Sequence, residues 1–288
     1  MEPPAFEPLK QFNYTMHAHL VFSKRSRITF VMTTLLTEPD LLDLAVRLAE
    51  AAGAEILAVR RDGFVIDRKD DQSPVTVADT RAEQLIVAGL REATPDIPVI
   101  AEEEVAAGRI TDPGDHFWLV DPLDGTREFA AGRGEFSVNI GLIINGQVRL
   151  GAVGAPAEGR VYAGIVGQGA HVIDARGRRP IHARTVPEEG MTVFASRHYA
   201  NDPALARYLS RFKVAHLTNI GSALKFCRLA EGRADFYPRL GRTMEWDTGA
   251  PQAVLEAAGG RVVKFDGQPL HYGKRGFENP PFLCFGAN

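Results

Sequence analysis

The amino-acid sequence predicts an α/β protein with α+β character, built as a layered sandwich, and three observations support this fold class. Amphipathic helices are indicated near the start of the chain, hairpin-forming strands follow them, and shorter strands then alternate with helices. Because a one-sided helix and a half-buried sheet must cover each other, this order favours helices layered on sheets. The length of 288 residues suits one large domain or two closely packed halves.

Two capping signals place the predicted helices of the first half. Thr37 and Asp40 have the spacing of a capping box, and Thr76 and Asp79 have it again. Apolar residues recur at helical spacing after each signal, at Leu41, Leu44, Leu48, Ala52, Ile56 and Val59 and at Ala82, Leu85, Ile86 and Leu90. The second helix must end before Pro95, and Asp79 lies in its first turn.

A meander of strands is predicted next. Apolar residues alternate from Val138 to Ile144 and lead into Asn145-Gly146, a strong hairpin signal, after which residues 148–155 supply the returning strand. Two more strands are indicated at residues 161–165 and 170–173. The first half is therefore predicted as helices packed on an antiparallel sheet.

The pattern changes near residue 185, after the basic, turn-rich segment 176–187. Strands are expected at 191–195, 216–220 and 235–237, and helices at 203–212, 223–231 and 248–258. We divide the chain into an N-terminal half, residues 32–185, and a C-terminal half, residues 186–288. Residues 1–31 have no sustained period and are interpreted as an N-terminal tail, a candidate for disorder.

Composition narrows the possible function classes. An apolar fraction of 45% and a charged fraction of 24% are typical of a soluble globular protein. The formal net charge of −3 gives no electrostatic footprint for polymeric nucleic acid or an anionic membrane. No segment after the tail has the apolar length of a membrane span. Cys227 and Cys284 lie in apolar segments, which indicates buried thiols and favours a cytoplasmic protein.

The most informative segment is Asp121-Pro122-Leu123-Asp124-Gly125-Thr126, which ends the apolar run Phe117–Val120. The run predicts a buried strand, and the proline and the glycine force a turn at its end. Two carboxylates at such a turn suit Mg²⁺, which prefers carboxylate and carbonyl oxygens. The last two residues are placed to open a short helix whose N–H groups face an anion. By itself, the segment is explained equally well by an Asx turn.

Three other acidic elements border apolar sequence, namely Asp79, Glu102-Glu103-Glu104 and Asp247. Taken singly, the two aspartates are explained as acids at helix N-termini and the glutamate run as a solvated loop. Together with Asp121 and Asp124 they have the scattered distribution of a discontinuous metal site. Five of these carboxylates could not share a cleft without cations, which two or three Mg²⁺ ions would supply; they are Asp79, Glu102, Asp121, Asp124 and Asp247. Two ions also suit in-line displacement at phosphorus by an activated water, without a covalent phosphoenzyme.

These motifs make the sequence recognisable. It resembles the inositol monophosphatase superfamily of magnesium-dependent, lithium-sensitive phosphatases in Ala101-Glu102-Glu103, in Asp121–Thr126, and in Glu245-Trp246-Asp247 with Ala258-Gly259-Gly260. Within that superfamily, segments 70–79, 124–129 and 221–232 are most similar to CysQ-type 3′(2′),5′-bisphosphate nucleotidases. The resemblance covers about residues 38–288. It implies the αβαβα architecture shared by inositol monophosphatases and fructose-1,6-bisphosphatases.

The resemblance also implies roles for individual residues. The metal ligands would be Glu102, Asp121, Asp124, Asp247 and the carbonyl of Leu123, with Asp79 beside them. Asp79 and Thr126, together with Glu102, would orient and deprotonate the attacking water. The substrate would be bound by Leu123, Asp124, Gly125, Thr126, Gly221, Ser222, Lys225 and Asp247. Two departures from the family pattern are Arg127, where lysine is common, and Gly249-Ala250-Pro251 after the last ligand.

The substrate side of the site is predicted less sharply. Gly221-Ser222 opens a helix with Lys225 one turn later, which suits a second phosphate or a nucleobase, but a Ser-capped helix with a surface lysine explains it equally well. Ser196-Arg197-His198 is a further candidate for the cleft wall, set against a plain strand-end loop. His182 and His216 are interpreted as structural.

The resemblance implies a phosphomonoesterase that removes the 3′-phosphate of adenosine 3′,5′-bisphosphate, with its sulfated relative as a second substrate. An inositol monophosphatase and a fructose-1,6-bisphosphatase-like sugar phosphatase share the metal motif and stay open as alternatives. A third alternative, from another class, is a non-catalytic metal-dependent sensor of a phosphorylated ligand. The expected partner is a small phosphorylated substrate, and the expected state is a monomer or a homodimer.

Overall fold

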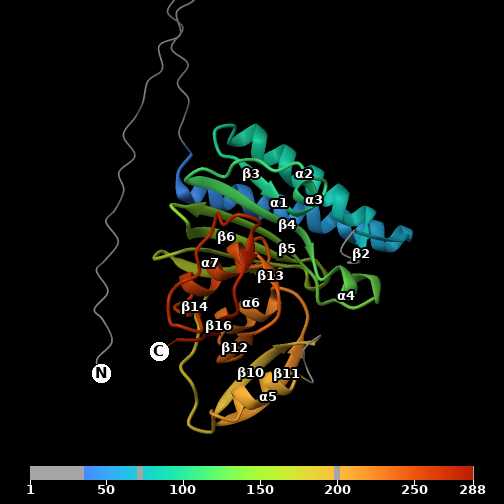
Figure 1. Cartoon of the computed structure of the whole chain (residues 1–288). Coiled ribbons are helices and arrows are strands. Elements are labelled where there is room, and N and C mark those ends of the chain that lie inside the picture. The colour runs from blue at the N-terminus through green and yellow to red at the C-terminus, as the bar shows by residue number, and fades with distance from the viewer. Residues whose placement is uncertain (1–35, 70–73, 198–201, 288) are drawn as a thin grey trace, which may run out of the picture. The chain divides into compact units, whose positions relative to one another are not determined.

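The computed structural model describes residues 36–69, 74–197 and 202–287. The proposed tail, residues 70–73 of the nucleotidase-like segment, and His198 lie outside the described residues. The fold consists of alternating layers of helices and sheets (Figure 1). This arrangement is the αβαβα sandwich that the resemblance implied.

The larger sheet has seven strands in the order β3-β4-β5-β6-β7-β8-β9. Their bounds are Val99–Ala101 for β3, His116–Asp124 for β4, Ser137–Ile144 for β5, Gln147–Ala155 for β6, Arg160–Ile165 for β7, Gly169–Asp174 for β8 and Gly177–Ile181 for β9. The predicted hairpin at Asn145-Gly146 joins β5 to β6. β3 runs parallel to β4, whereas the other neighbours are antiparallel.

One face of this sheet is covered by helices α1 (Glu38–Asp62) and α2 (Val77–Ala93). Both predicted capping boxes are confirmed, since Thr37 pairs with Asp40 and Thr76 pairs with Asp79 in each direction. Trp118, Val120, Ile140 and Leu142 of the sheet belong to the core beneath these two helices. The alternate residues of the same strands, including Leu119 and Ile143, belong to the core on the opposite face.

That opposite face is covered by α6 (Leu224–Ala230) and α7 (Gly249–Ala257), which separate it from a second sheet. The second sheet has the order β11-β10-β12-β16-β14. Its bounds are Met191–Ser196 for β10, Val214–Ile220 for β11, Phe236–Arg239 for β12, Arg261–Lys264 for β14 and Phe282–Phe285 for β16. Helix α5 (Pro203–Leu209) packs on the outer face of the second sheet, and the two form a third hydrophobic core.

The remaining elements are short. Helices α3 (Glu102–Ala106) and α4 (Thr126–Ala130) follow β3 and β4, and the 3₁₀ helix η1 spans Pro156–Glu158. Two small sheets pair β1 (Ile66–Arg68) with β2 (Pro74–Thr76) and β13 (Thr243–Met244) with β15 (Glu278–Asn279). Helix α3 begins with the acidic residues Glu102 and Glu103, whereas Asp121 and Asp124 belong to the end of β4 itself.

Four sequence expectations differ from the structure. The helix predicted at 203–212 ends at Leu209, and the turn-rich segment 176–187 contains strand β9. The strand at Phe117 does not stop at Val120 but continues to Asp124 through an irregularity in its pairing with β5. The β3 pairing is parallel, which local periodicity does not reveal. The division of the chain near residue 185 stays a prediction.

Close backbone packing sets the start of α7. A Cβ on Gly141 of β5 would lie 2.7 Å from the backbone nitrogen of Ala250, and a Cβ on Gly151 of β6 would also meet the Ala250 backbone. The two glycines therefore let the first turn of α7 lie directly on the sheet. This contact places Asp247, two residues before α7, beside the carboxyl end of β4.

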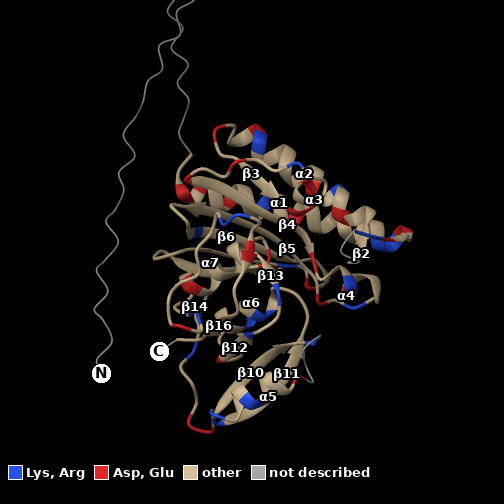
Figure 2. Ribbon diagram, viewed as in Figure 1, with Lys and Arg blue, Asp and Glu red and all other residues tan. Residues whose placement is uncertain are grey.

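The distribution of charged and apolar residues in the structure agrees with what the composition indicated. Acidic and basic residues both occur along α1 and α2 (Figure 2). Among the described residues, no helix is both long and apolar enough to cross a membrane. Cys227 and Cys284 are buried, free thiols, as predicted.

Candidate active site

The acidic turn is formed by the end of β4. Asp121 is 1% exposed, and its Oδ1 accepts a hydrogen bond of 3.0 Å from the backbone N–H of Leu123. The chain then reverses at Gly125, whose φ of 95° lies in the left-handed region, and Thr126 begins α4. The Asx-type hydrogen bond considered from the sequence is therefore present, and it leaves the second oxygen of Asp121 outside the turn.

Asp79 and Thr126 lie at hydrogen-bonding distance although 47 residues separate them. The Thr126 hydroxyl lies 3.0 Å from Asp79 Oδ1 and 3.1 Å from the Leu123 carbonyl, the two acceptors available for its proton. The other Asp79 oxygen accepts from the backbone N–H and the hydroxyl of Thr76 at 2.7 and 2.8 Å. Burial raises the pKa of Asp79, while these hydrogen bonds oppose the rise. The α2 capping box thus holds a buried carboxyl beside the acidic turn.

Glu102 and Glu103, at the start of α3, share one lysine. Lys69 Nζ lies 2.6 Å from a carboxylate oxygen of each. Burial lowers the pKa of Lys69, but the two glutamates outweigh it and raise that pKa above its usual range. Glu104 instead pairs with Arg91 at 2.7 Å, and all three glutamates belong to helix α3, so the solvated-loop explanation of the run is wrong. Lys69 was not predicted as part of the site.

Asp247 faces the turn from the other half of the chain. Its Oδ2 accepts a 2.9 Å hydrogen bond from the Met244 backbone N–H. Burial, then the charges of Asp124 and Glu102, raise the pKa of Asp247 to about 7. Its local neighbour Glu245 is buried and bound to Lys274 at 2.6 Å, so this acid has its own counter-charge. Asp247 is therefore the acid of this segment that shares the field of the acidic turn.

Neighbouring acids help to raise the pKa values of Asp121, Asp124 and Asp247. For Asp121, burial is the largest cause, and Glu102, Asp124 and Asp247 add to it. The pKa of Asp124 is also raised by burial and by Glu102, against the opposing effect of Lys225. Unbalanced buried carboxylates of this kind favour a hard divalent cation.

The donor set fits magnesium in its chemistry, because it consists of carboxylates and the Leu123 carbonyl. In the described part of the chain, no three Asp, Glu, His or Cys side chains are arranged to hold an ion as they stand. Their oxygens are turned toward protein donors instead, as when Glu102 binds Lys69 and Asp124 accepts from the Ala223 N–H. Ion binding would therefore require these side chains to exchange partners.

A cleft of about 760 Å³ joins the acids to the second half of the chain. Its wall includes nearly all the predicted residues, namely Glu102, Asp124, Gly125, Thr126, Gly221, Ser222, Lys225 and Asp247. Asp79, Asp121 and Leu123 lie behind this wall, 2%, 1% and 2% exposed. Ser196 also contributes to it, as the weaker prediction proposed.

Lys225 is buried, so the surface-lysine explanation is wrong. Its Nζ donates to the carbonyls of Ile220 at 3.2 Å and Ser222 at 2.5 Å, and lies 5.1 Å from the centre of the Tyr237 ring. Burial lowers the pKa of Lys225 to about 8, against the stabilising charge of Asp124. The Ser222 hydroxyl accepts from Leu224 N at 3.3 Å, but the N-cap of α6 is Ala223 and has no side-chain cap hydrogen bond, so the Ser-capped-helix explanation is wrong as well. Lys225 thus fixes the loop before α6 from within.

Three basic residues of the cleft wall were missed by sequence reasoning: Lys69, Arg239 and Arg242. Arg239 ends β12 and lowers the pKa of both Asp124 and Asp247, which places positive charge beside the acids. The signal available was the Tyr237-Pro238 pair after the 221–232 segment, directly before Arg239. No local pattern marks Lys69.

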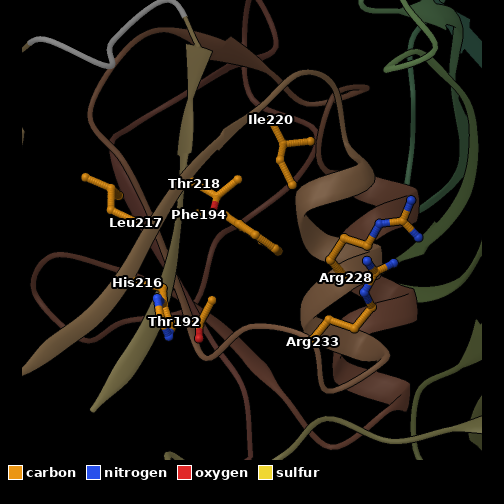
Figure 3. A pocket seen from close by; sticks show the side chains of 8 residues that line it. All are labelled: Thr192, Phe194, His216, Leu217, Thr218, Ile220, Arg228 and Arg233. Atoms are coloured by element: carbon orange, nitrogen blue, oxygen red, sulfur yellow. The ribbon is translucent and has the colours of Figure 1, made fainter. Parts of the chain in front are cut away.

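A second cavity of about 450 Å³ lies between β11 and α6 (Figure 3). No acidic residue lines it, and its residues are Thr192, Phe194, His216, Leu217, Thr218, Ile220, Arg228 and Arg233. Arg228 is already bound to Tyr162 at 2.5 Å and to Glu231 at 3.1 Å. His216, interpreted as structural, is exposed on β11. This cavity lacks the carboxylates that define the larger cleft.

Comparisons with known proteins agree with these motifs. The inositol monophosphatase family matches residues 38–281. The chain is 42% identical over 245 residues to the 3′(2′),5′-bisphosphate nucleotidase CysQ of Escherichia coli, covering 84% of this chain and 98% of that protein. Its fold is similar to the crystal structure of CysQ from Bacteroides thetaiotaomicron, with a TM-score of 0.72 and 32% identity over 86% of this chain and 97% of that one. The IMPase of Thermotoga maritima gives a TM-score of 0.72 at 26% identity, covering 85% of this chain and 92% of that one.

Proposed function

Since the chain belongs to the inositol monophosphatase family, we propose that it is a Mg²⁺-dependent phosphatase that removes the 3′-phosphate of adenosine 3′,5′-bisphosphate, leaving AMP. The sulfated relative of this nucleotide is the second proposed substrate. The observation that carries the proposal is the cleft in which Asp124, Asp247 and Glu102 face the Gly221–Lys225 segment. Nucleotidase relatives that match over nearly their full length support the choice of substrate.

The residues proposed to hold magnesium are Glu102, Asp121, Asp124, Asp247 and the Leu123 carbonyl. When bound, the metal supplies a lowered pKa for a water molecule and neutralises charge on the leaving oxygen. Two or three ions are proposed, because the crowded carboxylates need more positive charge than Lys69 and Arg239 provide. Glu102 would have to release Lys69 when it becomes a ligand.

Asp79 and Thr126 are proposed to orient the attacking water and remove its proton. The buried Asp79 carboxylate accepts from the Thr126 hydroxyl at 3.0 Å, so a proton arriving at Thr126 Oγ1 has a path to a base. The raised pKa of Asp79, caused mainly by burial, makes it a better proton acceptor than an exposed aspartate. The backbone N–H groups at Gly125 and Thr126 are proposed to bind the phosphate, since α4 begins there.

The rest of the substrate is proposed to lie against the C-terminal half. The Gly221-Ser222 backbone and the cationic residues Lys225 and Arg239 line that side of the cleft. Their charge suits the second phosphate of a bisphosphate nucleotide. A monomer or homodimer in the cytoplasm, where both cysteines stay reduced, is proposed on the same family grounds.

Phosphate release tests this proposal when three substrates are compared at equal concentration: adenosine 3′,5′-bisphosphate, inositol 1-phosphate and fructose 1,6-bisphosphate. We expect kcat/KM to be highest for the nucleotide, and release to require Mg²⁺. A clear preference for inositol 1-phosphate or the sugar bisphosphate would overturn the substrate assignment. The Asp121→Asn variant, purified in parallel, controls for contaminating phosphatases.

A non-catalytic sensor is the competing function from another class. A sensor has no use for a base beside the metal, whereas Asp79 and Thr126 are held together here. We therefore expect Thr126→Val to lose turnover while still binding AMP in calorimetry. If the wild-type protein bound the nucleotide with Mg²⁺ but released no phosphate, the sensor function would replace the enzymatic one.

A further inference from the structure

Glu135, in the segment between α4 and β5, joins three parts of the chain. Both of its carboxylate oxygens accept from Arg197 Nη2 at 2.6 Å. One of them also accepts from the backbone N–H of Gly221 at 2.9 Å. Arg197 directly follows β10, and Gly221 directly follows β11, so a single side chain ties two strand ends of the second sheet to the first half.

The backbone of Glu135 contacts the same region. A Cβ on Gly125 would lie 2.8 Å from the Glu135 carbonyl oxygen, and a Cβ on Gly221 would lie 3.0 Å from it. The carbonyl therefore fits closely against both glycines, and neither position has room for a side chain. Glu135 thus lies between the turn proposed to bind phosphate and the segment proposed to bind the rest of the substrate.

The Glu135 carboxylate is well satisfied as an anion. Partial burial acts to raise its pKa, but the hydrogen bonds from Arg197 and Gly221 hold that pKa below its usual range. It is not among the residues that line the cleft, so it holds other residues rather than the substrate. A second link runs parallel to it, since Asp124 accepts from the backbone N–H of Ala223, two residues after Gly221.

We propose that Glu135 is a positioning residue, which fixes the Gly221–Ala223 segment relative to the Gly125 turn so that both ends of a nucleotide substrate are bound at once. This inference rests on the proposed function and deepens it. We call the Glu135 contacts with Arg197 and Gly221 the clamp. Its loss should weaken binding of a substrate that reaches both segments. It should leave a small phosphate ester, which needs only the turn, nearly unaffected.

Glu135→Gln tests the clamp, because glutamine keeps the shape but loses the charge and one acceptor oxygen. We expect KM for adenosine 3′,5′-bisphosphate to rise about tenfold, with kcat changed by less than about twofold. For p-nitrophenyl phosphate, which has no nucleoside, we expect both constants to change by less than about twofold. Arg197→Met should raise the nucleotide KM similarly, and the double variant should add little, because both changes break one unit.

Glu38→Gln is the matched control. Glu38 also pairs with an arginine through two oxygens, at 2.5 and 2.6 Å from Arg149, but it begins α1 away from the cleft. We expect its KM for the nucleotide to stay at the wild-type value. An equal rise in KM for Glu38→Gln would show general loosening of the fold and overturn the positioning role.

Hydrogen–deuterium exchange supplies a readout that needs no substrate. In Glu135→Gln we expect faster exchange in peptides that contain Gly221 and Ala223, with unchanged exchange in α1. Unchanged exchange at 221–223 would overturn the inference whatever the enzyme hydrolyses. If the wild type released no phosphate from the nucleotide, the proposed function would fail on its own, and exchange would still decide whether the clamp exists. If the nucleotide were a substrate but its KM did not move, the clamp would have no role in binding.

Discussion

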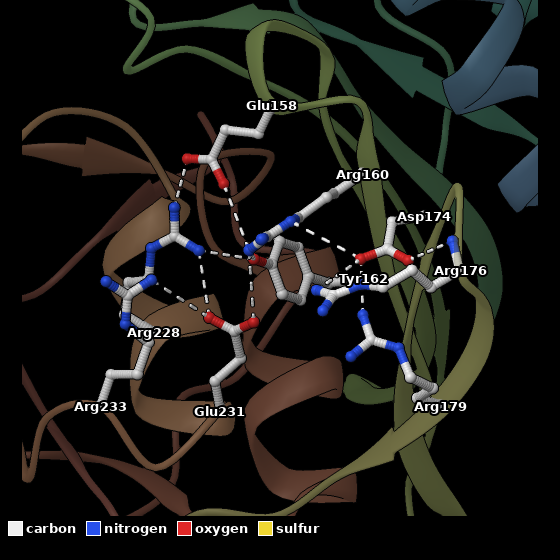
Figure 4. A network of polar contacts seen from close by, with 9 residues as sticks. All are labelled: Glu158, Arg160, Tyr162, Asp174, Arg176, Arg179, Arg228, Glu231 and Arg233. Atoms are coloured by element: carbon white, nitrogen blue, oxygen red, sulfur yellow. Dashed lines mark hydrogen bonds and ion pairs between the residues drawn. The ribbon is translucent and has the colours of Figure 1, made fainter.

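Two clusters of acidic residues in this molecule differ in how their charge is balanced. In the cleft, buried carboxylates face one another with few positive neighbours. In the second cluster, between α6 and strands β7 and β8, each carboxylate is paired with arginine (Figure 4). Its acidic members are Glu158, Asp174 and Glu231, and its basic members are Arg160, Arg176, Arg179, Arg228 and Arg233.

The pKa shifts express this difference. The backbone N–H of Arg176, with the charges of Arg179 and Arg176, holds the pKa of Asp174 below its usual range. Burial and neighbouring acids push the pKa of Asp121 the other way. Charge is balanced in the arginine-paired cluster and unbalanced in the cleft. The imbalance marks the cleft as a site for an external cation. A change in each cluster, and one at an isolated carboxyl outside both, test this difference.

The largest effect is expected from Asp121→Asn in the cleft. Removing a proposed ligand should lower kcat for phosphate release by about a thousandfold. The reason is that the metal would no longer be held where it stabilises the negative charge of the transition state. The fold should not suffer, since the change relieves crowding among buried acids. Thermal unfolding without metal is expected at the wild-type temperature or above it. Near-normal turnover would show that the metal assignment is wrong.

Arg228→Met creates an imbalance in the arginine-paired cluster. Arg228 Nη1 donates to Tyr162 at 2.5 Å and to Glu231 at 3.1 Å, and Nη2 pairs with Glu158. Its loss removes the nearest cation from two partly buried carboxylates and leaves them only arginines at 3.7 Å, so the free energy of unfolding should fall by about 3 kcal/mol. Urea denaturation measures this. A variant as stable as the wild type would mean that the remaining arginines suffice.

Glu256 in α7 shows the effect of burial on a carboxyl that has no acidic neighbour among the causes of its pKa shift. Burial raises the pKa of this single carboxyl to about 7, against hydrogen bonds from the Gln252 side chain, at 2.8 Å, and from the Val262 backbone N–H. Because the folded-state pKa exceeds the ordinary value of 4.5, the folded protein binds more protons between those two pH values. Its contribution to stability is full below pH 4.5 and is lost as pH rises through about 7.

We therefore expect Glu256→Gln to weaken the decline in stability between pH 4.5 and 7, with a gain of about 1 to 2 kcal/mol at pH 8. Activity with Mg²⁺ should not change, because Glu256 is absent from the cleft wall. Urea denaturation at several pH values tests this. Identical pH profiles for the two proteins would contradict the buried, raised-pKa description of Glu256.

Local signals predicted most of the fold. The two capping boxes and Asn145-Gly146 each act within four residues, so the sequence alone places α1, α2 and the β5–β6 hairpin. The parallel β3–β4 pair and strands β14 and β16 depend on distant partners, and no local period announces them. Strand β9 was hidden because its basic sequence resembles a turn-rich loop.

The candidate site divides in the same way. Its acids were predicted because each ends an apolar segment, and family resemblance then grouped them. Lys69 and Glu135 were missed because their importance comes from partners far along the chain, such as Glu102, 33 residues from Lys69, and Gly221, 86 residues from Glu135. No motif in the neighbouring sequence distinguishes this lysine or this glutamate from others in the chain.

Titration of the metal-free protein with Mg²⁺ in a calorimeter, at pH 7.5, tests the central claim most directly. If the unbalanced carboxylates form the metal site, the wild type will bind Mg²⁺ and its unfolding temperature will rise with Mg²⁺ concentration. Asp121→Asn will lose this binding, whereas Glu38→Gln, whose change lies at the start of α1, will keep it. Equal Mg²⁺ binding by the wild type and Asp121→Asn would contradict the account.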